Sequence, residues 1–356
     1  MKKKSIFLVT FNMYKGGSLA IYEKLENFIC KNKNLYNITF STKFKLDCDS
    51  KIELKYPSKR FNIFYRLMIE QVFLFLFALI KRPQQIILLG NFPCICWTGE
   101  QKILFHNLLY IEALKNPWKF RIKLFFESKF WEICIKIAKP KILVQTDYVK
   151  KTLENFFNFN LDIEIIGAPI ISSNYIFENS NKLVSKDKVE SYPKKNIDNN
   201  FLHLFYPASF YPHKNHKFLF FCSDIFLRNK IKIHLTIDDK LLTKNYHKEV
   251  FIFHKKLSRK KILHLYENTN GLIYSSLVES LGMPLLEVIQ YQKSVIAINL
   301  PYVHSAVTNL YFFEQNKNSL EQTLNKFKND FYHGKNKIAK TKINLDSRIF
   351  YENLIK

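Results

Sequence analysis

Two glutamates, Glu279 and Glu287, stand on either side of a turn that contains Gly282 and Pro284. The apolar run at residues 272–276 precedes the turn and predicts a short buried strand. Pro284 suits the first turn of a helix, where its missing N–H costs no hydrogen bond. A strand, a glycine-containing loop and a helix start direct backbone N–H groups at one place, so this stretch predicts an anion-binding turn beside two carboxylates.

A second polar turn carries a lysine. The segment Pro212–His216 reads Pro-His-Lys-Asn-His and follows an expected strand over residues 201–206. Between a strand and a helix, Lys214 is well placed to meet a phosphate as a point charge. His213 and His216 have a spacing that reaches a metal, but a mononuclear site needs three or four ligands and the neighbouring sequence supplies no acidic or Cys partner. We therefore expect no metal.

Two features of the first half also follow expected strands. Gly16 and Gly17 come after a strand over residues 5–11, and His106 comes after a strand over residues 102–105. Open α/β sheets place their sites at the carboxyl ends of strands. A plain tight turn and a structural histidine are the competing interpretations. The GxGxxG spacing of dinucleotide-binding folds is absent.

Together these segments resemble the retaining glycosyltransferases of family 4. The stretch from Glu279 to Glu287 resembles the E-x7-E signature of that family, and Pro212–Asn215 looks like its phosphate-binding lysine segment. Three weaker similarities follow in the family's order at residues 143–150, 167–169 and 347–354. The similarity covers most of the chain and is densest from residue 141 to 313. It implies the GT-B fold, an α/β architecture of two Rossmann-like, doubly wound domains that face a cleft.

The resemblance also implies roles for individual residues. Lys214 would hold the donor diphosphate, Glu287 the donor ribose, and Glu279 and His106, the expected catalytic residues, would meet the transferred sugar. Gly16 and Gly17 would lie near donor and acceptor. The residues that would bind the donor are Lys214, Asn215, Ser209, Gly282, Met283, Pro284, Leu285 and Glu287. Ser209 stands where the family usually has an arginine, which places more of the diphosphate charge on Lys214 or on another cation.

The implied reaction needs neither a metal nor another cofactor. As the glycosidic bond breaks, negative charge grows on the leaving nucleoside diphosphate, and a lysine and backbone N–H groups stabilise that charge. The expected function is hexosyl transfer from a nucleotide-sugar, with UDP favoured and GDP as an alternative. The acceptor would be a glycan or a lipid-linked molecule in surface polysaccharide or lipopolysaccharide synthesis.

The expected strands and helices alternate in two blocks. We assign residues 1–168 to an acceptor domain and residues 169–340 to a donor domain, with a polar linker or loop over residues 172–200. Residues 341–356 would form a helix that packs back toward the first domain.

Composition bounds the protein class. The chain has 356 residues, 47% of them hydrophobic, and a net charge of +25. This charge favours an anionic partner, although a Lys- and Asn-rich coding bias would also produce it. The long apolar helix expected over residues 59–82 has basic ends, which suggests peripheral contact with an anionic membrane. Six scattered cysteines and no recognisable signal peptide favour a cytoplasmic protein.

Other functions compete with this interpretation. A GT-B-like epimerase or phosphorylase would share the motifs, and a basic nucleic-acid-binding protein would share the charge. No helix-turn-helix, RNP or zinc pattern supports nucleic-acid binding, so we expect no nucleic-acid partner. A non-catalytic scaffold that keeps the fold is a further alternative, favoured only by Ser209.

Overall fold

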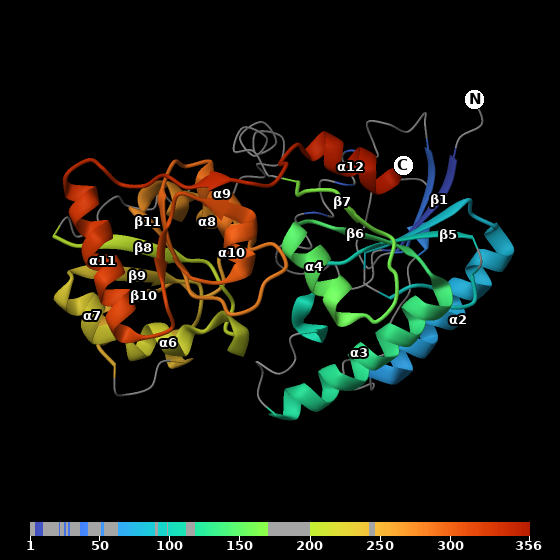
Figure 1. Cartoon of the computed structure of the whole chain (residues 1–356), viewed down its shortest axis with the longest axis horizontal. Coiled ribbons are helices and arrows are strands. Elements are labelled where there is room, and N and C mark those ends of the chain that lie inside the picture. The colour runs from blue at the N-terminus through green and yellow to red at the C-terminus, as the bar shows by residue number, and fades with distance from the viewer. Residues whose placement is uncertain are drawn as a thin grey trace, which may run out of the picture. The chain divides into compact units, whose positions relative to one another are not determined.

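The computed structural model describes residues 4–9, 21, 25, 28, 36–41, 51–52, 63–89, 92–97, 99–111, 118–169, 200–241 and 246–356. Gly16, Gly17 and residues 172–199 fall outside this set, so the predictions for them stay predictions. The chain divides into two compact units. Unit 1 comprises residues 1–113, 118–169 and 344–356, and unit 2 comprises residues 114–117 and 170–343. Each unit is built on a parallel sheet with helices packed on it (Figure 1).

The sheet of unit 1 has the strand order β3-β2-β1-β4-β5-β6-β7, so the chain order reverses between β1 and β4. Such a reversal defines a doubly wound sheet. The strands are β1 (Lys4–Val9), β2 (Tyr36–Ser41), β3 (Lys51–Ile52), β4 (Gln85–Leu88), β5 (Glu100–Leu104), β6 (Lys141–Val144) and β7 (Ile163–Ile165). The helices with defined bounds are α2 (Ile63–Lys81), α3 (Trp118–Ala138), α4 (Asp147–Phe156) and α12 (Ser347–Ile355).

The last helix of the chain covers one face of this sheet. Ile6 and Leu8 of β1 share a buried cluster with Leu354 and Tyr351 of α12. The Tyr351 hydroxyl donates to the carbonyl of Ile21 at 3.0 Å. The final helix therefore belongs to the core of unit 1, although more than 170 residues of unit 2 precede it in the chain.

The opposite face is covered by α2 and α3. Phe7 of β1 stacks on Phe77 of α2 with ring centroids 3.9 Å apart, and Phe105, just after β5, packs on Trp131 of α3 at 4.8 Å. With both faces covered, every residue of β4 is buried, which is the usual condition of a central strand in a parallel sheet.

The sheet of unit 2 has the order β10-β9-β8-β11-β12-β14, and its reversal lies between β8 and β11. Its strands are β8 (Leu202–Tyr206), β9 (Ile231–Leu235), β10 (Phe251–Phe253), β11 (Gly271–Tyr274), β12 (Ser294–Ile298) and β14 (Tyr311–Phe313). Its helices are α6 (His216–Phe221), α7 (Ser223–Arg228), α8 (Arg259–Asn268), α9 (Met283–Ile289), α10 (Pro301–Ala306) and α11 (Lys317–Tyr332). A separate antiparallel pair joins β13 (Val307–Thr308) to β15 (Lys340–Thr341).

Two sequence predictions for unit 2 need correction. The apolar spacing of the sequence predicts one helix over residues 215–227. That prediction is wrong as a single element: Asn215 is left-handed with φ 55°, and the helix divides into α6 and α7 at Cys222. The edge strand β14 and the short α10 were not expected. The apolar runs of the sequence also predict strands over residues 201–206, 232–237, 250–253 and 294–298, and β8, β9, β10 and β12 lie there to within two residues.

Among the helices that the structure describes, none is both long and apolar enough to cross a membrane.

A chain of three histidines crosses the sheet of unit 2. Nδ1 of His203, on β8, lies 2.8 Å from Nε2 of His234, on β9. Nδ1 of His234 lies 2.8 Å from Nε2 of His254, which directly follows β10. His203 and His234 are buried. Burial, reinforced by the neighbouring His254, His203 and Lys232, lowers the pKa of His234 to about 3.

This pKa predicts acid sensitivity of unit 2. Unfolded His234 takes up a proton below about pH 6.5, whereas the folded residue resists until about pH 3. Stability is therefore unaffected above pH 6.5 and falls as the pH decreases toward 3. Between pH 7 and pH 5, one such histidine lowers the free energy of unfolding by about 2 kcal/mol. His234→Gln should remove that part of the loss in urea titrations followed by circular dichroism.

Tryptophan fluorescence provides the internal reference, because all three tryptophans, Trp97, Trp118 and Trp131, lie in unit 1. At each pH, the urea unfolding transition that these tryptophans report should be the same in the wild type and in His234→Gln. An equal loss of stability in wild type and His234→Gln would show that the histidine chain does not cause the acid sensitivity.

Candidate functional site

Lys214 and Glu279 meet at the carboxyl ends of two neighbouring strands of unit 2. Lys214 follows β8 and Glu279 follows β11, and these strands pair in parallel at the point where the strand order reverses. The Lys214 ammonium forms an ion pair with Oε1 of Glu279. Open α/β sheets place ligands beyond the carboxyl ends of their strands at such a reversal. The fold thus joins the two motifs that the sequence places 65 residues apart.

The backbone around Lys214 is held in place by the end of β11. Pro212 starts a 3-10 turn that ends at Lys214, and Asn215 then adopts a left-handed conformation. The carbonyl of Lys214 accepts the Tyr206 hydroxyl at 2.6 Å and Ser275 Oγ at 3.3 Å. These bonds fix where the side chain of Lys214 begins, so its ammonium reaches a defined place.

Asn215 adds a donor to this turn. The residue is buried, and its Nδ2 has no hydrogen-bond partner in the part of the chain that the structure describes. A buried amide N–H without a partner is costly.

Glu279 is ionised in this environment. Burial by itself would raise the pKa of its carboxyl, but the Lys214 ammonium and hydrogen bonds from Lys214, Ser276 and Tyr274 outweigh burial and hold the pKa below its ordinary value. The Tyr274 hydroxyl donates to Oε1 at 2.8 Å. Burial and the Glu279 charge raise the pKa of Tyr274, so this phenol stays protonated as a donor.

Gly282 lets the chain turn from Glu279 into α9. Its φ of 70° is left-handed, and a Cβ there would lie 2.9 Å from Cδ1 of Leu285. Pro284 occupies the first turn of α9, as the sequence predicts. Met283, Pro284 and Leu285 thus come directly after the turn that carries Glu279.

Glu287 is 7% exposed and is held by α8. Its Oε2 accepts the Tyr266 hydroxyl at 2.9 Å, and its Oε1 lies 2.8 Å from Nη2 of Arg259. A carboxylate offers about four acceptor positions. These contacts orient Glu287 and leave capacity for the hydroxyl groups of a ligand.

Two other predicted site residues, His106 and Ser209, are not among the residues that contact Lys214, Glu279 or Glu287 in the interactions described above. His106 lies in unit 1 just after β5, where its Nδ1 is 3.3 Å from the Leu104 carbonyl oxygen. Burial lowers the pKa of His106, which keeps the imidazole neutral at pH 7. Ser209 lies in the loop after β8 and is exposed.

The sequence did not single out the tyrosines and the arginine that position these groups. Tyr206 and Tyr274 end their strands, and the apolar residues directly before them gave them the appearance of core residues. Arg259 did carry a signal: it is the first residue of α8, where a cation opposes the helix dipole and needs a compensating partner.

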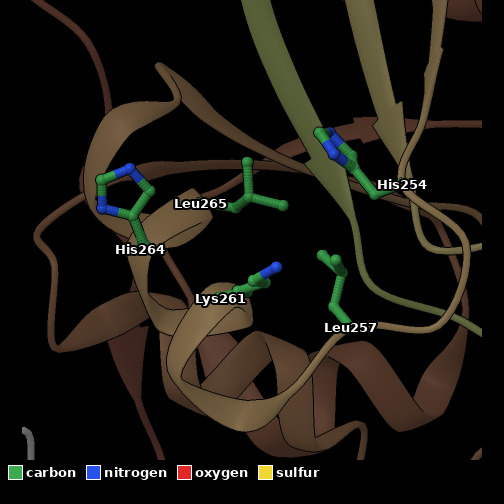
Figure 2. A pocket seen from close by; sticks show the side chains of 5 residues that line it. All are labelled: His254, Leu257, Lys261, His264 and Leu265. Atoms are coloured by element: carbon green, nitrogen blue, oxygen red, sulfur yellow. The ribbon is translucent and has the colours of Figure 1, made fainter. Parts of the chain in front are cut away.

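A small cavity lies on the other side of α8. It is lined by His254, Leu257, Lys261, His264 and Leu265 (Figure 2). Its volume is about 10 Å³, room for one water molecule. Lys261 and Leu265 lie on the helical face opposite Arg259 and Tyr266, so this cavity is not continuous with Glu287. Within the described ranges, no three His, Cys, Asp or Glu side chains are grouped so that they could hold a metal ion.

Residues 187–342 match the model of the family described as glycosyl transferases group 1. The match spans less than half of the chain and includes Lys214, Glu279 and Glu287. A search of curated proteins by sequence finds no match.

Solved structures resemble the whole chain. WaaG, a glycosyltransferase involved in lipopolysaccharide biosynthesis, has a TM-score of 0.68 at 12% identity, over 98% of this chain and 94% of that one. A glycosyltransferase from Rickettsia africae ESF-5 has a TM-score of 0.67 at 16% identity over 100% of both chains. Anabaena HepE, solved with UDP and glucose, has a TM-score of 0.61 at 10% identity over 98% and 93%. These similarities confirm the expected α/β, GT-B fold class.

The left-handed glycine before α9 predicts a measurable strain. Gly282→Ala should lower the free energy of unfolding of unit 2 by about 1–3 kcal/mol, because alanine must adopt the left-handed conformation and its Cβ meets Leu285. Urea titration by circular dichroism measures the loss.

Gly334→Ala is the matched control. Its φ of 67° is similar, but an added Cβ would meet nothing within 4 Å. It should therefore cost only the conformational part, about 1 kcal/mol. Equal losses in the two variants would show that the contact with Leu285 contributes nothing.

Proposed function

We propose that this protein is a retaining hexosyltransferase that moves a sugar from a nucleotide-sugar donor to a glycan or lipid-linked acceptor. UDP is the favoured nucleotide and GDP the alternative. The observation that carries this proposal is the meeting of Lys214 and Glu279 where the strand order of unit 2 reverses. The family match over residues 187–342 supports it, because Lys214, Glu279 and Glu287 all fall inside the match.

In the proposed site, Lys214 and Asn215 bind the donor diphosphate. An ammonium has three N–H donors, so Lys214 can keep its contact with Glu279 and still donate to phosphate oxygens. The unpartnered Nδ2 of Asn215 adds a neutral donor, and Ser209 and the backbone from Gly282 to Leu285 complete the phosphate site. These groups stabilise the charge that develops on the departing diphosphate, and the proposal includes no metal or cofactor.

Glu279 and His106 are the proposed catalytic residues. The ionised carboxylate of Glu279 stabilises the positive charge that develops on the anomeric carbon as the bond to phosphate breaks. The acceptor hydroxyl then attacks from the face that the diphosphate leaves and gives its proton to the departing phosphate, which retains the configuration. The family resemblance assigns the transferred sugar to His106, and it assigns the donor and the acceptor to Gly16 and Gly17.

Glu287 binds the donor ribose in this proposal. Tyr266 and Arg259 hold its carboxylate in one orientation, and its remaining lone pairs accept the two ribose hydroxyls. Besides Lys214, Arg259 is the basic residue that the proposed donor site contains, and its ion pair is with Glu287.

The comparisons favour a place in the assembly of surface glycans. One structural neighbour acts in lipopolysaccharide biosynthesis and another was solved with UDP and glucose. We propose the same donor class for this chain, with surface polysaccharide or lipopolysaccharide as the product and the cytoplasmic face of the membrane as its location.

Nucleotide binding gives the first test. UDP, GDP and ADP are each added to the protein and thermal unfolding is followed. The cognate nucleotide at about 100 times its Kd should stabilise the protein by roughly 2.7 kcal/mol. Lys214→Ala should abolish this shift. Lys141→Ala is the matched control, since it removes a Lys–Glu ion pair, with Glu164, at the amino-terminal end of a strand in unit 1. A panel in which no nucleotide shifts the wild type would refute the proposal.

Turnover gives the second test. Glu279→Gln and Glu287→Ala should each lower the rate of sugar release from the cognate nucleotide-sugar by roughly 100- to 1,000-fold, because each removes a contact made to the transition state or to the donor. The proposal also expects full activity in the presence of EDTA. Release that depends on inorganic phosphate would identify a phosphorylase, and conversion of the donor without acceptor would identify an epimerase.

A further inference from the structure

Helices α2 and α3 carry large apolar side chains that the fold leaves in solvent. On α2 these are Val72, Leu76, Leu79 and Ile80, and on α3 they are Phe125, Phe126, Ile133 and Ile137. Each is 51–75% exposed. We call these eight residues the α2–α3 face.

The two helices lie on the same side of the sheet. Phe7, which contacts α2, is paired in register with Ile86 of β4, and Ile86 is paired with Gln101 of β5. Paired residues of a parallel sheet point to the same side, and every second residue returns to it. Phe105, which contacts α3, is four residues beyond Gln101 and therefore shares that side.

The loop after β4 also links the two helices. Gln71 of α2 donates to the Pro93 carbonyl at 2.8 Å, and Phe92 packs on Phe130 of α3 with ring centroids 5.9 Å apart. Because α2 and α3 both pack on this side of the sheet, their exposed sides both face outward from it.

Cations accompany this apolar surface. Lys81 ends α2 and Arg82 follows it. Lys129 and Lys136 lie along α3 and Lys139 follows it, and all five residues are exposed. Both helices precede strands of a parallel sheet, so they run in the same direction and their basic ends lie at the same edge. Glu132 forms ion pairs with Lys129 and Lys136 at 2.9 and 2.8 Å. This one carboxylate does not balance the five cations, so the described part of this surface carries a net positive charge.

The charge decides between the possible occupants. A second copy of the chain in a two-fold dimer would bring this surface against itself and oppose like charges. An anionic bilayer supplies both kinds of partner: acyl chains for the apolar side chains and lipid phosphates for the lysines and the arginine. Long Lys and Arg side chains reach head groups while their stems stay on apolar surface.

We propose that the α2–α3 face binds peripherally to an anionic membrane. Unit 1 lies with the outer sides of both helices in the lipid interface, and the basic helix ends contact head groups. This surface does not depend on the transferase activity; only the inference that it brings a lipid-linked acceptor to the protein rests on the proposed function.

Flotation with lipid vesicles tests the proposal on the full chain. Wild type should bind vesicles that contain phosphatidylglycerol roughly tenfold or more tightly than vesicles of phosphatidylcholine alone, and high salt should weaken the binding. The double variant Leu76→Asp/Ile133→Asp should lose roughly tenfold or more of the affinity, because each substitution places an anion in the apolar surface.

Tyr332→Asp is the matched control, since it places the same charge at an apolar residue of unit 2 that is 63% exposed. It should bind vesicles like the wild type. Unchanged circular dichroism and an unchanged thermal shift with the cognate nucleotide would show that the double variant is folded. The thermal shift tests only the proposed function, and vesicle binding tests only the α2–α3 face, so failure of one proposal can be told from failure of the other.

Three results would overturn the proposal: no binding of wild type to phosphatidylglycerol vesicles, equal binding of the double variant, or a wild-type dimer in solution that the double variant dissociates. The last result would assign the α2–α3 face to a second copy of the chain instead.

Discussion

The ion pair between Lys214 and Glu279 depends on the order of strands in unit 2. The two residues lie on loops that leave β8 and β11, and these strands are neighbours only because the chain reverses its direction of winding there. The tyrosines that end the same strands, Tyr206 and Tyr274, hold the Lys214 backbone and the Glu279 carboxylate. The sheet therefore determines both where the two charges lie and how they are oriented.

A common principle organises the two carboxylates of the site. Glu279 is paired with Lys214 and a tyrosine, and Glu287 with Arg259 and a tyrosine. A half-buried charge is tolerated when it is paired and hydrogen bonded. Such pairing holds both carboxylates in fixed orientations, so a donor that adds a diphosphate and hydroxyl groups finds charges that need little reorganisation.

Unit 1 uses its two faces differently. The face that α12 covers is closed, because Tyr351 bonds the Ile21 carbonyl and Leu354 fills the core. The face that α2 and α3 cover is closed only toward the sheet, and its outer side keeps Leu76, Ile133 and their neighbours in solvent. A helix that is apolar on both sides needs a second partner besides its sheet, and this requirement distinguishes α2 and α3 from the amphipathic α4.

The sequence by itself determined the strand–turn–helix character of the site. Pro212, Gly282 and Pro284 act through local backbone geometry, so their turns were predictable, and the family resemblance assigned the fold class that the structure has. Only the tertiary structure decided the rest. Asn215 ends a turn instead of starting a helix, because its backbone is left-handed. Tyr274, Tyr266 and Arg259 gain their roles from partners 5, 21 and 28 residues away on other elements. Periodicity reports which face a side chain occupies but not which residue meets it there, and that pairing is set by strand order and helix packing.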